Sequence, residues 1–303
     1  MILRRLDDLQ RRHTVLSFGW AVIRKYLDDR GAREAALITY YGFLSLFPTL
    51  LLGVAIVSQV LARRPELRQE LVAALVPPAL QPGIEAGIAE MSQSSAALVA
   101  GVIGLLFSGT GVVFSAYETL NHLAGVPFRD RGMISRYLRV LAGLLVILAG
   151  LLAVAAAAWL SPAAALIGSC VIAFLMLLLV AKLLLARPAP VTRLWPAAAI
   201  GALAVTAMLN LGASVLPELV RRAGRVYGAF ATVAGAFTLL YLVSNVLVLA
   251  AEIAVVRHAR LWPRALDTGR PTPADGRAMA LLAREQERVP GDRVVHTWTT
   301  PPS

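Results

Sequence analysis

The sequence is poor in charge and in cysteine. Of its 303 residues only 16% are charged, against about 25% in a soluble globular domain. Apolar residues make up 58% of the chain and the mean hydropathy is +0.69, so the composition predicts a polytopic membrane protein. The single cysteine, Cys170, lies in an apolar run and excludes a disulfide framework or a cysteine-based metal site within one chain.

Lysine is also scarce. Arginine supplies nearly all the positive charge, Lys25 and Lys182 are the only lysines, and the formal net charge is +11. We attribute the preference for arginine to genome composition. A basic protein can bind nucleic acid, but in a membrane protein basic residues gather on cytoplasmic loops, so we expect no specific nucleic acid partner. The N-terminal segment is charged throughout and lacks the apolar core of a signal peptide, so we expect none to be cleaved.

Long charge-free runs predict the fold class, an all-α polytopic membrane protein with six transmembrane helices. The first run, Ala35–Ala62, has 28 residues and exceeds the ~20 that cross a bilayer as a helix. Pro48 near its middle removes one backbone hydrogen bond, so we expect a kinked first span packed inside a bundle. A helical hairpin that turns at Ser161-Pro162 fills the longest run. The runs after the first are Met91–Tyr117, Val140–Ala181, Leu194–Pro217 and Val226–Ala251.

Positive charge divides unequally between the two ends of these spans. An even number of spans puts both termini on one side, and 23 of the 29 lysines and arginines fall on that side. Because positive residues are retained in the cytoplasm, we expect a multi-pass protein of the plasma membrane with both termini cytoplasmic. The remaining six are Arg63, Arg64, Arg68, Arg221, Arg222 and Arg225.

The chain divides into three parts. Residues 1–33 are basic and amphipathic, which is typical of a helix that lies in the membrane interface with anionic headgroups beside its cations. The alternative is a soluble helix packed on the bundle. Residues 34–257 form the six-helix membrane domain. Residues 258–303 form a basic, proline-containing cytoplasmic tail, which we expect to be largely disordered apart from a short helical piece near Ala278–Arg288.

Polar residues within the spans are candidates for a cavity lining or a polar network. A carboxylate in mid-membrane costs about 2.5–3.5 kcal/mol on insertion scales, but Glu118 and Glu252 lie near the inner ends of their spans, where the cost shrinks. Each could instead pair with a nearby arginine, such as Arg129 or Arg257. The asparagines and tyrosines could equally serve interhelical hydrogen bonding and packing. The candidates are Tyr40, Tyr41, Ser45, Pro48, Glu118, Asn121, Tyr227, Asn245 and Glu252.

No pattern predicts catalysis, a metal site or a cofactor. The four histidines, His13, His122, His258 and His296, are scattered, and the acidic residues lack the clustering that metal-dependent nucleases need. No GxxxxGK[ST] phosphate-binding loop occurs. We therefore expect no enzymatic activity.

Three segments carry a resemblance to a known family. They are EAALITYYGFLSLFP at Glu34–Pro48, SAYETLNHLAGVPFRDR at Ser115–Arg131 and VYGAFATVAGAFTLLYLVSNVLVLAAEI at Val226–Ile253. In this order they resemble the YihY/virulence factor BrkB family of bacterial inner-membrane proteins. The chain departs from the family pattern in having Ala250-Ala251 before the glutamate and no tryptophan soon after Asn121. The resemblance implies six helices with both ends cytoplasmic.

The resemblance does not fix an activity, since family members have been labelled as ribonucleases or linked to serum resistance or envelope-lipid export. Our preferred hypothesis is transport or handling of an envelope lipid, or of another amphipathic or anionic compound, through a polar intramembrane cavity. The alternative is a membrane scaffold or assembly factor without transport activity, and a ribonuclease is less favoured. The expected partners are membrane lipids, with anionic headgroups at the basic termini, and a second copy or an envelope protein.

Overall fold

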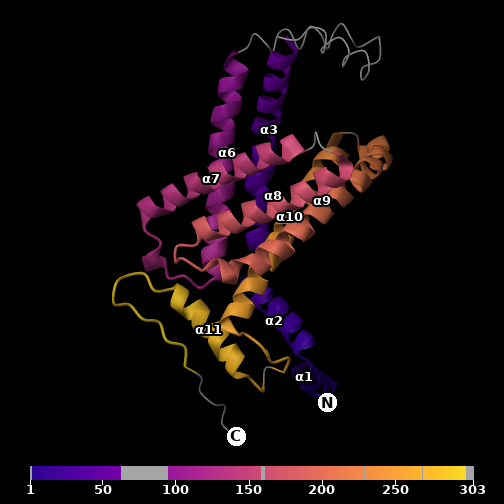
Figure 1. Ribbon diagram of the computed structural model, residues 1–303. Coiled ribbons are helices and arrows are strands. Elements are labelled where there is room, and N and C mark those ends of the chain that lie inside the picture. Colours follow the sequence, from indigo (N-terminus) through magenta and orange to yellow (C-terminus); the bar gives the residue numbers. More distant parts are fainter. Residues whose placement is uncertain (1, 63–94, 158–160, 228, 268, 298–303) are drawn as a thin grey trace. The chain divides into compact units, whose positions relative to one another are not determined.

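The computed structural model describes residues 2–62, 95–157, 161–227, 229–267 and 269–297 (Figure 1). Within these ranges every regular element is helical, which confirms the predicted all-α fold. A short 3-10 turn, Phe128–Asp130, links two of the helices. The α-helices are α1 (Ile2–Arg12), α2 (Thr14–Asp28), α3 (Gly31–Ala62), α6 (Ser95–Leu123), α7 (Met133–Ala157), α8 (Pro162–Leu184), α9 (Val191–Tyr227), α10 (Ala229–Ala259) and α11 (Pro273–Glu285).

Six of the described helices are long and apolar enough to cross a membrane, which confirms the predicted number of spans. The hairpin predicted at Ser161-Pro162 is present as α7 and α8, and Pro162 is the first residue of α8, where its missing N–H costs nothing. Helix α3 continues through Pro48, and its kink stays a prediction. The spans are Gly31–Leu52, Leu98–Leu123, Met133–Ala157, Pro162–Leu184, Val191–Val215 and Phe230–Ala259.

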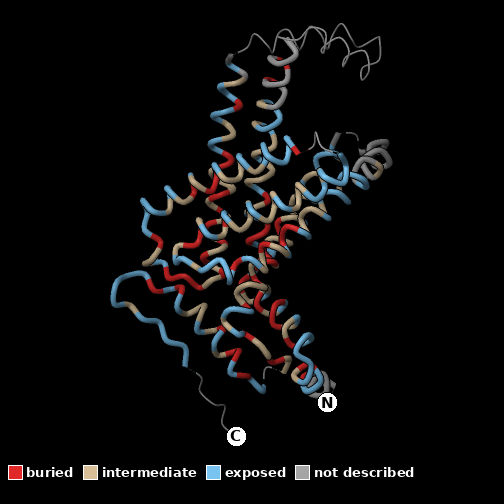
Figure 2. The backbone as a smooth tube through the Cα atoms, viewed as in Figure 1, coloured by how far each residue is buried: buried red, intermediate tan, exposed pale blue. Residues whose placement is uncertain are grey.

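The spans are apolar, and most of their residues are exposed or intermediate in burial (Figure 2). Only 11% to 28% of the residues in each span's most apolar stretch are buried. Phe107, Leu152 and Phe230 are 85%, 72% and 68% exposed. Exposed apolar side chains in this number are unfavourable in water and match the hydrocarbon of a bilayer.

The chain folds as two compact units, Met1–Thr39 with Val113–Ser303, and Tyr40–Val112. In the first unit α7 packs on α8, α8 on α9, α9 on α10, and α10 on α2. Its apolar contacts form clusters, one around Tyr117 and Leu184 and another that joins Val22 of α2 to Val256 of α10. The end of α6 and the start of α3 meet through Leu123 and Ala35.

The second unit is held by close approach of α3 and α6 at glycines. A Cβ atom added at Gly111 would lie 2.5 Å from the Tyr41 ring, and one added at Gly104 would lie 3.0 Å from the Pro48 ring. These positions are seven residues apart on each helix, so they share one face. The small residues therefore act as a packing surface, as small residues in membrane helices usually do.

The segment after α10 differs from the largely disordered tail that the sequence predicted. Helix α11 starts earlier than the helical piece expected near Ala278–Arg288, at a capping box in which Thr272 and Asp275 exchange hydrogen bonds. Arg264, 1% exposed, pairs with Asp275 at 2.6 Å and with Asp28 of α2 at 2.8 Å. Ion pairs and a helix cap order this segment, and composition alone does not reveal either.

Candidate functional site

The nine predicted site residues fall in different parts of the chain. Glu118, Asn121, Asn245 and Glu252 belong to the first unit. Tyr40, Tyr41, Ser45 and Pro48 belong to the second unit. Tyr227 ends α9, and its side chain lies outside the described residues. A cavity common to all nine stays a prediction.

In the second unit the candidates pack among themselves. The Tyr40 and Tyr41 rings meet edge to face with centroids 5.2 Å apart, and Tyr40 is 54% exposed. The Ser45 hydroxyl donates to the Gly42 carbonyl oxygen at 2.7 Å, a bond within its own helix. These contacts favour the packing alternative for this group.

In the first unit, Glu252 takes part in a buried ionic cluster that we name the lysine–carboxylate cluster: Lys25, Asp29 and Glu252. Lys25 and Asp29 are each 1% exposed, and Glu252 is fully buried. The Lys25 ammonium donates to the Asp29 carboxylate and, at 3.1 Å, to the Leu123 carbonyl oxygen, and it lies 3.5 Å from Oε2 of Glu252. Arg257, the partner considered from the sequence, is exposed and does not take this role.

The local fold explains how Lys25 and Asp29 meet. They are four residues apart, one helical turn, and Asp29 is the C-terminal cap of α2, with its N–H bonded to the Lys25 carbonyl oxygen. Burial raises the pKa of Asp29, and the adjacent Lys25 ammonium only partly offsets that rise. Desolvation is therefore the largest influence on the pKa of Asp29 in this cluster.

A second set of charged groups lies beside the cluster. His122 Nε2 lies 3.2 Å from the Asp29 carbonyl oxygen, and Nδ1 lies 2.7 Å from Oε2 of Glu285 on α11. Because a carbonyl oxygen only accepts, Nε2 carries a proton, and contact with a carboxylate requires a second proton between Nδ1 and Glu285. Arg131 donates to the other Glu285 oxygen at 2.8 Å, which favours ionised Glu285 and an imidazolium ring.

The Glu285 carboxyl is tuned by these partners. Burial alone would raise its pKa, but the His122 and Arg131 contacts outweigh burial and hold the pKa below its usual range. Glu118 is the outer member of the set, with Arg131 at 2.9 Å and Arg136 at 3.2 Å. An arginine does pair with Glu118, although not Arg129.

The two asparagines serve structure. Asn121 donates to the Leu184 carbonyl oxygen at 2.9 Å and accepts from the Ala186 N–H at 2.8 Å, so it caps the C-terminal end of α8. The Asn245 side-chain oxygen accepts from the Tyr26 hydroxyl and so ties α10 to α2. Asn245 therefore serves interhelical hydrogen bonding, which was the alternative to a cavity lining.

Several members of the site escaped sequence reasoning. Lys25 and Asp29 lie in the segment assigned to the membrane interface, and Glu285 lies in the short helical piece that we expect near Ala278–Arg288 of the tail. One signal was present: Lys25 is one of only two lysines among 29 basic residues. The buried position of Lys25 gives this lysine a specific role, which an explanation by genome composition does not include.

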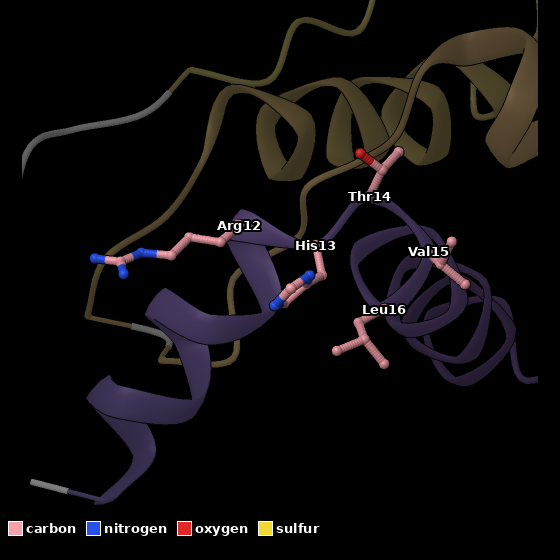
Figure 3. A pocket seen from close by; sticks show the side chains of 5 residues that line it. All are labelled: Arg12, His13, Thr14, Val15 and Leu16. Carbon is pink, nitrogen blue, oxygen red and sulfur yellow. The ribbon is translucent and has the colours of Figure 1, made fainter.

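A shallow hollow of about 570 Å³ lies at the junction of α1 and α2, lined by Arg12, His13, Thr14, Val15 and Leu16 (Figure 3). Val15 and Leu16 are 84% and 53% exposed. The hollow thus combines cationic and apolar side chains, which is the combination that membrane interfaces attract.

The six long apolar helices define an integral membrane protein, and comparison with known proteins gives its family. The chain belongs to the family described as Virulence factor BrkB, which it matches over residues 22–275. This confirms the resemblance carried by the three segments. No curated protein and no solved structure matches the chain. Among the described residues, no group of three or more His, Cys, Asp or Glu side chains is arranged to hold a metal ion.

Proposed function

We propose that this integral membrane protein lies in the plasma membrane with both termini cytoplasmic, and that it transports or handles an envelope lipid, or another amphipathic or anionic compound. The lysine–carboxylate cluster is the observation that supports the proposal. Three ionisable side chains are buried where α2 meets the end of the last span. Ionisable groups in such positions are costly, and in membrane proteins they mark substrate and ion pathways.

The alternatives have less support from the same residues. A ribonuclease would need acidic or histidine side chains free to bind metal or polarise a phosphate, whereas Glu118, Asp29 and Glu285 contact basic side chains. A scaffold would need partner surfaces but no buried ionisable cluster. We therefore rank transport first, the scaffold second and the ribonuclease third.

Complementation tests the proposal. In a strain whose envelope integrity depends on this protein, we expect Glu252→Gln to lose function while inserting at normal levels. Glu118→Gln should lose part of it, since Glu118 is partly exposed and holds Arg131. Asp8→Asn, at an exposed pair with Arg270, is the matched control. Full complementation by both glutamine variants would remove the case for these carboxylates, and reporter fusions to each terminus test the orientation.

A further inference from the structure

The lysine–carboxylate cluster contains more acidic than basic groups. It has two carboxyl groups and one ammonium group, and both carboxyl groups contact the same lysine nitrogen. Since all three side chains are buried, water screens neither carboxylate. Two like charges around one counter-ion in a low dielectric favour proton uptake by one of them.

Hydrogen bonding leads to the same conclusion. Lys25 directs donors to Asp29 and to the Leu123 carbonyl oxygen. Neither oxygen of Glu252 accepts a hydrogen bond, and Oδ1 of Asp29 accepts none. Two ionised carboxylates thus have too few donors for a buried site. A protonated carboxyl group brings a donor of its own, which one of the unfilled acceptor oxygens can take.

Charged groups on the neighbouring elements do not remove the excess. From α6, His122 contacts the Asp29 backbone and pairs with Glu285 of α11, which also pairs with Arg131. From α2, Tyr26 bonds to α10 through a neutral hydroxyl, and burial raises the pKa of that hydroxyl. His122 and Arg131 share Glu285, and Arg131 and Arg136 share Glu118, so this set has three cations and two carboxylates. Its cations contact Glu285, Glu118 and the Asp29 backbone and not the carboxylate oxygens of Asp29 or Glu252, so within its own contacts the cluster keeps one surplus carboxylate.

We propose that Asp29 and Glu252 share one proton and form a proton-binding site of this membrane protein. The ligand is a proton rather than a metal cation because the Lys25 ammonium already contacts both carboxyl groups. Proton uptake makes the cluster neutral, and release leaves one buried negative charge, so the two states favour different packing of α2 against α10. This proton site deepens the proposed function, because it supplies the ion whose movement is coupled to transport. That role in transport rests on the proposed function.

Infrared difference spectroscopy of the purified, detergent-solubilised full chain tests the site without any substrate. We expect the wild type to show the carbonyl stretch of a buried, protonated carboxyl group at mildly acidic pH, shifted in D₂O and lost as the pH rises. Glu252→Gln and Asp29→Asn should each abolish the band, because Lys25 balances the remaining carboxylate. Lys25→Met should move the loss of the band to higher pH, and the exposed Asp8→Asn should leave the band unchanged.

The outcomes separate cleanly. No titrating band in the wild type, or a band that survives in both Glu252→Gln and Asp29→Asn, would overturn the proposal. If one variant does not insert, the other still decides. The infrared experiment uses no substrate, so a missing band does not contradict the transport proposal. Failure of the complementation test likewise does not contradict the proton site.

Discussion

At the residue scale, Lys25 is the side chain on which the buried cluster depends. Its ammonium group contacts Asp29, Glu252 and the Leu123 carbonyl oxygen, so it joins α2, α10 and the end of α6. A compact ammonium with three donors suits a site with three oxygen partners better than a planar guanidinium does. This gives a reason for a lysine at this position in a chain whose only other lysine is Lys182.

Replacing Lys25 by methionine should destabilise the protein strongly. The change keeps the volume of the side chain but leaves buried carboxylates without a cation, and breaking a buried pair in this way costs about 3–5 kcal/mol. Chemical unfolding in detergent micelles, monitored by tryptophan fluorescence, measures the loss. Arg24→Met is the matched control, since Arg24 lies 38% exposed beside Asp28 and exposed pairs contribute ~0–1 kcal/mol. Equal losses would show that Lys25 is not a buried counter-ion.

Asp275 gives the tail a pH dependence of known sign. Burial alone would raise its pKa, but hydrogen bonds from Thr272, Arg264 and Ala265 outweigh burial and lower it. A carboxyl group whose folded pKa lies below its unfolded value stabilises the fold above the unfolded value, and this contribution is lost as the pH falls through the folded one.

We therefore expect the tail to loosen as the pH falls below the ordinary aspartate value of ~3.9. Limited proteolysis at a series of pH values, with an acid-stable protease, should show cleavage near α11 rising on acidification. Asp275→Asn should be cleaved faster already at neutral pH, with little further change on acidification, and Asp8→Asn should behave as the wild type. If the tail of Asp275→Asn resisted the protease as well as the wild-type tail does, the Asp275 carboxylate would not stabilise the tail.

At the element scale, the glycine face between α3 and α6 determines how closely these helices approach. Gly111 lies against the Tyr41 ring and Gly104 against the Pro48 ring, whereas a Cβ added at Gly42 would meet no described atom within 4 Å. All these glycines are helical, so replacement by alanine at an open position should stabilise the helix by about 0.5–1 kcal/mol.

The predicted sign therefore differs between matched variants. Gly111→Ala should destabilise the protein by about 1–3 kcal/mol through overpacking against Tyr41, while Gly42→Ala should be neutral or slightly stabilising. Melting temperatures in one detergent measure both. If Gly111→Ala raised the melting temperature as Gly42→Ala does, the close contact with Tyr41 would not be a constraint.

The helices could be predicted from the sequence because their signal is local. Apolar length locates each span, and Ser161-Pro162 locates the α7–α8 turn. The ordered tail could not be predicted, since Arg264 binds Asp28 across 236 residues of sequence. No apolar pattern accompanies that pair. The pairing of Lys25 with Glu252 could not be predicted for the same reason, because the two residues are far apart in the sequence and no local pattern links them.

At the scale of the whole molecule, two features decide how the protein meets its membrane. The spans present apolar side chains, and α2 has a stripe of its own at Leu16, Ile23 and Leu27, which are 53%, 52% and 59% exposed. These positions follow helical spacing, so they share one face of α2. The other side of α2 packs on α10 through Ala21 and Val22. The two alternatives from the sequence are therefore compatible: α2 packs on the bundle and still presents an apolar face.

We expect that face to lie in the headgroup region of a bilayer, drawn there by its apolar area and by cations such as Arg12 beside it. A fluorophore at Ile23→Cys, in a Cys170→Ser background, should be quenched by a quencher attached to lipid chains in vesicles of anionic lipid. The same fluorophore at Gln286→Cys, an exposed site at the end of α11, should be quenched only by a water-soluble agent. Protection at Ile23 from both quenchers would mean that a protein surface, such as a second copy, covers the stripe instead of lipid.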